Sequence, residues 1–508
     1  MKNLINKSWA IFLGVVILVS CTKNFEEINK DPNSPSVDLA APDMLLANAI
    51  ETMTDRVHET FLGEEMGNCW VQHEAKVQYT DEDRYIPRVT VINNTWTSFF
   101  ASSGQDVVTL YKIGVDRDMP NYQGVALVLK AYISSVLTDL FGDIPYTEAW
   151  SAAAEDGGVV SPAYDSQQEV YTDLISILEQ ANTLLDPDGQ PISGDILYNG
   201  DILKWKKFAN SLKMRLLIRI SDRQDPSSAI QTMVNDPGTY PMFESNDDDA
   251  QLNYLGAAPN NNPRHENRKT RDDHRVSKTI TDFMWTQSSY VDWRICVFAD
   301  LSANGDFEGI PNGLTSAEAA DYNGGGLKMS KIGSYFSQAT TPGVLMSYSE
   351  VLFCYAEAAF KGWIPGGATA AGTYYEQAIH ANYNHYGQDL VDIVDAYFSM
   401  GMTADELADD FLVNEDHAWN DAEGIRLIGE EKWITLFDQG LEAWAEWRRL
   451  DYPVLVPGPS AVLSEVPKRV YYPSDESARN GTNWAAAKSA QGITSDSDLL
   501  TKVWWDVN

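Results

Sequence analysis

Three carboxylates, those of Asp139, Asp143 and Glu148, lie close together in the sequence DLFGDIPYTEAW. A pair of carboxylates could supply the acid and the base of a hydrolytic reaction. The same segment contains Gly142, which can end a helix in the left-handed conformation, and Pro145, which prevents the helix from resuming. Since turns collect Asp and Gly for conformational reasons, we favour a rigid elbow between helices (residues 139–150) over a catalytic loop.

A long apolar segment, Tyr122–Thr138, leads into this elbow. Its apolar residues recur at helical spacing and occupy both sides of the expected helix: Val125, Val128, Leu129, Tyr132 and Val136 on one side, and Leu127, Ile133 and Leu137 on the other. The pattern predicts a helix that is buried nearly all round. Tyr146 and Trp150 each combine a large apolar face with one polar atom, so we expect them to pin the elbow onto the helix ends.

Cys21 is a second candidate for chemistry, because it follows a short targeting segment. Lys2 and Lys7 form a basic region, and residues 9–19 are apolar but too few to span a bilayer. Leu-Val-Ser-Cys at 18–21 resembles a lipobox, in which the cysteine thiol receives a diacylglycerol. The sequence therefore predicts a lipoprotein signal peptide at 1–20 and a lipid-anchored tether at 21–40. The alternative is an ordinary secretory peptide with an incidental cysteine.

The remaining cysteines and the histidines give little sign of metal or disulfide chemistry. Three cysteines remain, Cys69, Cys296 and Cys354, and an odd number cannot form a complete set of disulfides. No two of them form a Cys-x-x-Cys pair, which would suggest zinc. The acidic segments 247–249 and 304–306 lack the spacing of a calcium loop, so we interpret both as solvated turns. Nucleophile-elbow, zinc-protease and phosphate-loop patterns are absent from the sequence. We therefore predict no catalytic residue, no metal site and no cofactor.

The charge of the chain excludes several kinds of partner. Its 508 residues carry a formal net charge of −36, which becomes −38 without the two lysines of the predicted signal peptide. Such a charge repels nucleic acid and anionic surfaces, which leaves the lipid on Cys21 as the membrane attachment. We expect no later segment to span a membrane. The hydrophobic content of 44% indicates a large core, and without a clear linker we expect residues 41–508 to form one domain.

Helical periodicity recurs along this domain, whereas strand-like alternation is sparse. The segment 351–362 and the segment around Tyr374 and Ile379 are joined by a Pro-Gly-Gly turn, which predicts a packed helix pair. The segments 122–140 and 169–185 could form a similar pair. The fold class is therefore mainly α, with helix pairs as scaffold and long irregular loops inserted between them.

Two further helices have distinctive side chains. Lys213, Arg215 and Arg219 make one helix basic in an acidic protein, so we expect them to pair with carboxylates, including those of the elbow. We expect a single helix over 430–450. Its face of Trp433, Phe437, Gly440, Trp444 and Trp447 is more typical of a core than of a ligand platform.

Several segments, in order along the chain, resemble the SusD/RagB family of outer-membrane nutrient-binding lipoproteins. They are Asn-Lys-Asp-Pro-Asn at 29–33, Gly-Asp-Ile-Pro-Tyr-Thr-Glu-Ala at 142–149, Pro-Ala-Tyr-Asp-Ser at 162–166, Lys-Trp at 204–205, Ala-Asn-Ser-Leu-Lys at 209–213, Ala-Glu-Ala at 356–358, Glu-Lys-Trp at 431–433, Glu-Ala-Trp at 442–444, Arg-Arg at 448–449, Lys-Arg-Val at 468–470, Tyr-Pro at 472–473 and Trp-Trp-Asp at 504–506. Each is weak alone, but together they are specific, and the N-terminal one is nearest the branch that reads Asn-x-Asp-Pro-Asn.

This resemblance implies a SusD-like helical fold in which tetratricopeptide-like helix pairs carry long loops. It also implies a lipid-anchored protein on the outer face of the outer membrane, without catalytic activity. The family's partner is a SusC-like TonB-dependent transporter, to which an oligosaccharide or other nutrient is delivered. The resemblance does not identify the ligand, which could be a glycan or a peptide.

Two loops supply the aromatic and polar residues that sugars require, namely flat rings for C–H faces and amides or acids for hydroxyls. The loop 69–100 contributes Trp70, Tyr79, Tyr85 and Trp96, and the loop 254–322 contributes Trp285 and Tyr290. We take these six residues as candidate ligand contacts, with packing in the core as the alternative for each. Trp293, beside an arginine, fits the core better.

Two other functions remain open at this stage. A surface glycoside hydrolase would need two carboxylates at an aromatic cleft, and acidic residues are abundant here. An adhesin or assembly subunit would use the surface of the helix pairs to bind protein. Turnover of a glycan would identify the first, and the lack of both a neighbouring transporter gene and a small ligand would favour the second.

Overall fold

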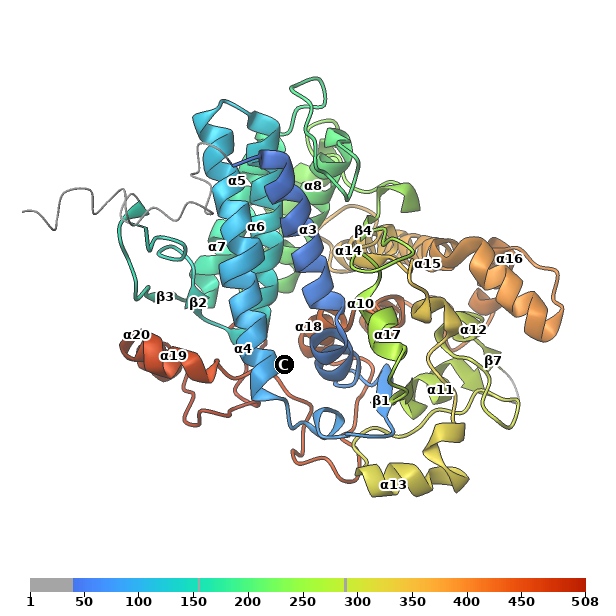
Figure 1. Cartoon of the computed structure of the whole chain (residues 1–508). Coiled ribbons are helices and arrows are strands. Elements are labelled where there is room, and N and C mark those ends of the chain that lie inside the picture. The colour runs from blue at the N-terminus through green and yellow to red at the C-terminus, as the bar shows by residue number, and fades with distance from the viewer. Residues whose placement is uncertain (1–39, 154–155, 287–289) are drawn as a thin grey trace, which may run out of the picture. The chain divides into compact units, whose positions relative to one another are not determined.

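Helices dominate the chain, which confirms the predicted mainly-α fold (Figure 1). The computed structural model describes residues 40–153, 156–286 and 290–508. Cys21, the signal peptide and residues 21–39 of the tether lie outside the described residues, so lipidation stays a prediction. Pro42–Asn508 forms one compact unit.

Five helices of the N-terminal half pack against one another in succession. They are α3 (Pro42–His58), α5 (Gly104–Asp116), α6 (Pro120–Phe141), α7 (Gln167–Leu184) and α8 (Ile202–Arg219). Figure 1 shows α5, α6 and α7 side by side. The predicted pairing of the segments 122–140 and 169–185 is thus confirmed as the contact between α6 and α7.

Helix α6 is buried as its sequence predicts, and it extends beyond the predicted segment 122–138 at both ends. Pro120 occupies its first turn, where a missing N–H costs nothing, and Gly142 ends it with φ of +79°. We expected no later segment to be long and apolar enough to span a membrane. This expectation is wrong, because α6 meets both criteria of length and composition. However, 89% of its most apolar window is buried inside the protein, so its apolar surface is used by neighbouring helices.

A second group of helices contains the other predicted pair. Helix α14 (Tyr348–Phe360) packs against α15 (Gly367–Phe398), and α16 (Ala404–Leu412) packs against α15. The rings of Tyr355 and Tyr374 stack across the pair with centroids 5.2 Å apart. The predicted Pro-Gly-Gly turn joins the two helices.

The single helix expected over 430–450 is instead two helices, α17 (Gly424–Thr435) and α18 (Gly440–Leu450). Asp438 adopts a left-handed conformation with φ of +72° between them and pairs with Arg264. Gly440 lies so close to Asn68 that a Cβ atom at position 440 would be 2.3 Å from the Asn68 nitrogen. The break in the helix allows this approach, and periodicity alone could not show it. The predicted aromatic stripe is nevertheless buried, with each large side chain at most 6% exposed.

Strands are short, and within the described residues they occur in four antiparallel pairs. In the pair β1 (Glu74–Lys76) and β5 (His274–Val276), Lys76 lies opposite His274, which joins the two loops proposed to bind ligand. The other pairs are β2 (Ile144–Pro145) with β3 (Tyr164–Asp165), β4 (Ala250–Leu252) with β8 (Gly343–Met346), and β6 (Trp285–Thr286) with β7 (Tyr290–Val291).

The remaining elements lie mostly in the loops and at the C-terminal end of the chain. They are η2 (Thr60–Asn68), η3 (Glu82–Arg84), α4 (Val89–Thr97), η4 (Ser98–Ser103), α9 (Ser227–Asn235), η6 (Asn246–Asp248), α10 (Pro263–Arg268), α11 (Lys278–Met284), α12 (Ile295–Phe298), α13 (Ser316–Asp321), η7 (Tyr322–Gly324), η8 (Gly326–Lys328), η9 (Ser334–Ser337), α19 (Ser474–Arg479) and α20 (Gly481–Ala490).

The close approach at Gly440 generates the first prediction. Gly440→Ala should lower the free energy of unfolding by about 1–3 kcal/mol, because the added methyl group meets backbone atoms that cannot easily move. Gly481→Ala is the matched control, since Gly481 also begins a helix but has no atom within 4 Å of its Cβ position. Denaturant unfolding of both variants measures the difference, and equal stability of the two would contradict the packing described.

Candidate functional site

Asp139, the first carboxylate of the elbow, is fully engaged in structural contacts. Its Oδ1 accepts hydrogen bonds from Tyr171 Oη at 2.6 Å and from Trp505 Nε1 at 2.8 Å. Its Oδ2 pairs with Arg219 Nη1 at 2.7 Å. The pairing of the basic helix α8 with the elbow, expected from the sequence, is therefore confirmed.

The other two elbow carboxylates hold the chain on either side of the β2–β3 pair. Asp143 Oδ1 accepts a hydrogen bond from the backbone nitrogen of Gln167 at 2.9 Å, at the start of α7. Glu148 Oε2 accepts one from the backbone nitrogen of Ala163 at 2.7 Å. All three carboxylates are thus occupied by contacts within the fold, as the structural interpretation of the elbow requires.

The two aromatic residues of the elbow make the contacts predicted for them. Tyr146 is buried, and its hydroxyl donates to Asp173 Oδ2 on α7 at 2.6 Å. Trp150 Nε1 donates to the carbonyl oxygen of Phe100 at 2.6 Å. The elbow is therefore fixed to two different neighbouring segments.

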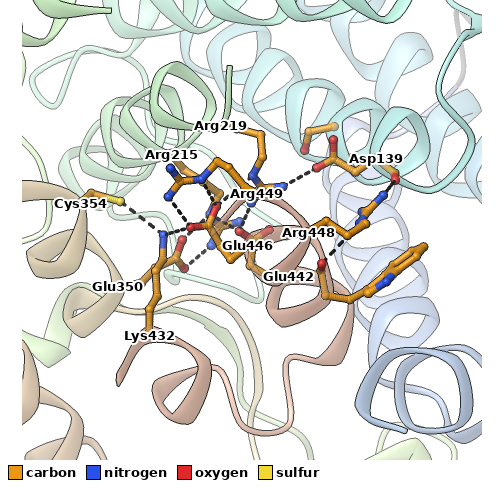
Figure 2. Close-up of polar contacts among 12 residues, drawn as sticks. Asp139, Arg215, Arg219, Glu350, Cys354, Lys432, Glu442, Glu446, Arg448 and Arg449 are labelled. Atoms are coloured by element: carbon orange, nitrogen blue, oxygen red, sulfur yellow. Dashed lines mark hydrogen bonds and ion pairs between the residues drawn. The ribbon is translucent and has the colours of Figure 1, made fainter. Parts of the chain in front are cut away.

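The contact between Asp139 and Arg219 belongs to a larger buried charge network (Figure 2). Arg219 Nε pairs with Glu446 Oε1 of α18 at 2.9 Å, and Lys432 Nζ of α17 pairs with Glu446 Oε2 at 2.7 Å. The positive members are Arg215, Arg219, Lys432, Arg448 and Arg449, and the negative members are Asp139, Glu350, Glu357, Glu442 and Glu446. The two signs are equal in number, so the network buries little net charge.

Glu446 is the centre of this network. Burial opposes ionisation of its carboxyl, but the charges of Arg449, Lys432 and Arg219 outweigh burial and hold the pKa of Glu446 well below its usual value. Glu446 therefore stays charged and joins α18 to α8 and α17. Because a buried charge without its partner is costly, the five helices that contribute groups to the network (α6, α8, α14, α17 and α18) depend on one another for their positions.

Arg448 differs from the other cations of the network, because its guanidinium contacts the rings of Trp444 and Trp505 in place of a carboxylate. Its guanidinium carbon lies 3.8 Å from the centre of the Trp444 ring, and its Nη1 donates to the carbonyl oxygen of Asp139 at 2.8 Å. Burial lowers the pKa of Arg448 to about 10. Arg448 thus connects α18 directly to the backbone of the elbow.

Three of the six candidate ligand contacts are buried in the core. Trp70 and Tyr85 are at most 2% exposed and Trp96 is 8% exposed. Trp70 packs edge-on against Trp444 with centroids 5.0 Å apart, and Trp96 packs similarly against Phe141 at 5.1 Å. The structure gives these side chains a packing role, which was the alternative considered for each of them.

The candidates of the second loop lie elsewhere. Trp285 is half-buried and packs against Phe307 and Phe398 with centroids 5.1 Å and 5.8 Å away. Tyr290 belongs to β7, but its side chain lies outside the described residues. Trp293 is 7% exposed, which confirms its assignment to the core. Binding by Trp285 and Tyr290 stays a prediction.

Among the predicted aromatic residues whose side chains are described, Tyr79 lies most open to solvent, with 57% of its side chain exposed. The guanidinium carbon of Arg271 lies over one face of its ring, 4.5 Å from the centre. Arg271 also lines a polar cavity of about 320 Å³. The β1–β5 pairing brings this part of the second loop to Tyr79, since the nitrogen of Val77 donates to the carbonyl oxygen of Asp273 at 2.7 Å.

The cavity beside Tyr79, which we term the polar pocket, is lined by Arg268, Arg271, Asp272, Asp273, His274, Asp300, Lys331, Ile332, Ser334 and Ser337. Ion pairs fix several of these groups: Arg271 Nη2 lies 2.8 Å from Asp273 Oδ2, and Lys331 Nζ lies 3.0 Å from Asp272 Oδ2. The pocket thus presents paired donors and acceptors, and its Arg271 lies against an exposed aromatic ring, which is a combination suited to recognise a sugar.

The polar residues of this pocket are not among the ligand contacts predicted from the sequence. A signal for them was present, because the segment 268–275 reads Arg-Lys-Thr-Arg-Asp-Asp-His-Arg and concentrates basic residues in a strongly acidic chain. Pairing of this segment with β1 depends on contacts about two hundred residues apart along the chain, which local patterns do not reveal.

The acidic segment 247–249 also differs from its expectation as a solvated turn. Asp248 and Asp249 are each 5% exposed. Asp248 Oδ2 pairs with Lys207 Nζ at 2.9 Å, and Asp249 Oδ2 lies 2.8 Å from His385 Nδ1. A run of like charges predicts a solvated turn, and the distant residues Lys207 and His385 that pair with it are not evident from local sequence.

Comparisons with known proteins agree with this architecture. Residues 32–473 match the SusD-like family model, described as starch-binding and associating with the outer membrane. No curated protein matches the chain. A solved chitin-binding protein is 27% identical, with a TM-score of 0.76 and coverage of 92% of this chain and 100% of that chain.

Two further solved structures share the fold at lower identity. A SusD homologue from Bacteroides fragilis is 24% identical, with a TM-score of 0.74 over 92% of this chain and 99% of that chain. A chitin-binding SusD homologue from Flavobacterium johnsoniae is 22% identical, with a TM-score of 0.72 over 92% of this chain and 98% of that chain.

The charge network predicts a large effect of removing one cation. Arg219→Gln should lower the free energy of unfolding by about 3–5 kcal/mol, because Asp139, Glu442 and Glu446 lose a buried partner. Arg426→Gln is the control, since Arg426 also contacts two carboxylates but is 30% exposed and should cost less than about 1 kcal/mol. Similar losses in denaturant unfolding would show that the network is not a special source of stability.

Asp143 provides a prediction about pH. Burial raises the pKa of its carboxyl from 3.8 to about 6. The folded protein therefore binds an extra proton between about pH 4 and 6, so this group's contribution to stability falls as pH rises through that window. Asp143→Asn removes this titrating group. The free energy of unfolding of the variant, relative to that of the unmodified protein, should therefore rise by up to about 3 kcal/mol between pH 4 and 7.

Thermal unfolding at several pH values measures this difference. Asp222→Asn, a change at an exposed position, serves as the control and should follow the unmodified protein throughout. A stability difference for Asp143→Asn that does not change with pH would contradict the raised pKa of this buried carboxyl.

Proposed function

Because this chain belongs to the SusD-like family, whose members bind nutrients at the outer membrane, we propose that it captures a neutral oligosaccharide on the cell surface. It then delivers the sugar to a SusC-like TonB-dependent transporter. Catalysis is not part of this function, and no cofactor is required. The lipid on Cys21 anchors the protein to the outer membrane.

The polar pocket beside Tyr79 carries this proposal. The exposed ring supplies an apolar surface for the C–H face of a sugar, while the ion-paired side chains supply hydrogen-bonding groups for its hydroxyls. The pocket volume of about 320 Å³ is at the lower end of the range for small-molecule sites. It suits one or two sugar units, with the remainder of an oligosaccharide lying along the surface.

The charges of the pocket favour a ligand without net charge. Three basic side chains, those of Arg268, Arg271 and Lys331, are matched by the three carboxylates of Asp272, Asp273 and Asp300. Most of these charges already have a partner within the protein. An acidic sugar would have to compete with these carboxylates, whereas hydroxyl groups can join the existing hydrogen bonds.

The solved relative that binds chitin makes chito-oligosaccharides the first ligands to test, followed by starch oligosaccharides because of the family description. A peptide or another nutrient is the alternative cargo. A glycoside hydrolase would release shorter products from the same mixtures, and an adhesin would bind neither glycan nor transporter. Copurification with a TonB-dependent barrel supports the delivery role.

Calorimetric titration with these oligosaccharides tests the proposal. Tyr79→Ala and Arg271→Ala should each weaken binding about tenfold, which corresponds to about 1.4 kcal/mol, because each removes a principal contact in the pocket. The sugar should be recovered intact. Trp285→Ala and Tyr290→Ala test the other predicted positions, since Trp70, Tyr85 and Trp96 are buried in the core.

Trp484→Ala is the matched control for the aromatic contact. Trp484 also has a cation over its ring, Lys488 Nζ at 4.4 Å, and lines another cavity of about 320 Å³. Its loss should leave the affinity unchanged. Weaker binding in this variant, with normal binding by Tyr79→Ala, would move the ligand site away from the polar pocket. Cleavage of the sugar would overturn the binding function in favour of an enzyme.

A further inference from the structure

Three potential metal ligands, Glu64, Glu74 and His274, come together between the polar pocket and the core. Each residue offers one ligand atom, and these three atoms all lie within 4.8 Å of one another. All three residues are buried. Three different elements supply them: the π-helix η2, strand β1 and strand β5. Glu74 lies opposite Val276, two residues from His274, so the two side chains lie on the same face of the β1–β5 pair.

The fold uses one oxygen of each glutamate and leaves the other without a hydrogen bond. Glu64 Oε1 pairs with Arg264 and with Arg268 Nη2, the latter at 3.0 Å. Glu74 Oε1 accepts a hydrogen bond from Asn68 Nδ2 at 2.9 Å. By contrast, Glu64 Oε2, Glu74 Oε2 and His274 Nε2 are buried and make no hydrogen bond.

Buried polar atoms without partners are costly, so their occurrence in one cluster indicates a missing ligand. Glu74 Oε2 has one distant charged neighbour, Arg268 Nη2 at 3.7 Å. This contact is too long for a hydrogen bond. An ion held among these three side chains would offer the unpaired atoms a partner.

The surrounding charges call for a cation. The carboxylates of Glu64, Glu74 and Asp438 outnumber the guanidinium groups of Arg264 and Arg268, since Arg264 pairs with Asp438 as well as with Glu64. The cluster therefore buries an excess of negative charge. The arginines hold the Oε1 atoms and thereby orient the two carboxylates, as neighbours of metal ligands commonly do.

We propose that Glu64, Glu74 and His274 bind a divalent transition-metal cation at the base of the polar pocket. Two carboxylate oxygens and one imidazole nitrogen suit Zn²⁺ or Mn²⁺ better than Ca²⁺, which prefers a shell of oxygens. Ligand atoms around zinc are about 3.4 Å apart for bonds of about 2.0–2.2 Å, so the side chains need to shift by only about 1 Å. His274 and Arg268 line the pocket, which provides a route for the ion.

The full chain, purified in detergent and treated with a chelator, is titrated with ZnCl₂ and separately with MnCl₂, with metal content measured after dialysis. The proposal predicts one tightly bound equivalent and an increase in melting temperature. His274→Gln and Glu74→Gln should each weaken binding at least about tenfold. Circular dichroism reports whether each metal-free variant is folded.

His380→Gln is the matched control, because His380 also lies beside two carboxylates, Asp405 at 3.1 Å and Asp409 at 3.2 Å, but on the surface. This variant should retain the tight site. If the cluster variants do not fold, pulsed electron paramagnetic resonance of the Mn²⁺-loaded unmodified protein decides, through coupling to an imidazole nitrogen. The absence of a tight equivalent, the absence of that coupling, or loss of the site in His380→Gln would overturn the proposal.

Discussion

The pairing of Arg219 with three carboxylates from two distant helices is the constraint on which the rest of the structure depends. Arg219 contacts Asp139 at the end of α6 and both Glu442 and Glu446 on α18. Ion pairs buried this deeply persist only where geometry and balance are good. The elbow, the N-terminal helices and the C-terminal helices are therefore locked into one arrangement, although they are far apart in sequence.

A rigid scaffold of this kind allows the loops to carry function. The break between α17 and α18 places Gly440 against η2 and directs Asp438 toward Arg264. Arg264 in turn contacts Glu64, beside the β1–β5 pair that brings Tyr79 and Arg271 together. The polar pocket is thus connected to the charge network through a short series of buried contacts. This connection gives loop residues the fixed positions that ligand recognition requires.

Sequence patterns predicted the features that depend on local chemistry. Helix α6, its end at Gly142 and the pairing of Arg219 with the elbow were all predicted, because apolar spacing and uncompensated charge are visible along the chain. The family resemblance was confirmed as well. Features set by distant contacts were not predicted. Trp70 and Trp96 have the composition of a binding loop but face the core, and Arg271 reaches Tyr79 only through the pairing of β1 with β5.

A crystal structure of the protein with a bound oligosaccharide would show directly whether the sugar lies in the polar pocket. We expect an intact sugar ring against the Tyr79 side chain, with its hydroxyls in hydrogen bonds to Arg271, Asp273 or Asp300. A sugar bound instead beside Trp285 and Phe398, or in the cavity near Trp484, would contradict this assignment of the site.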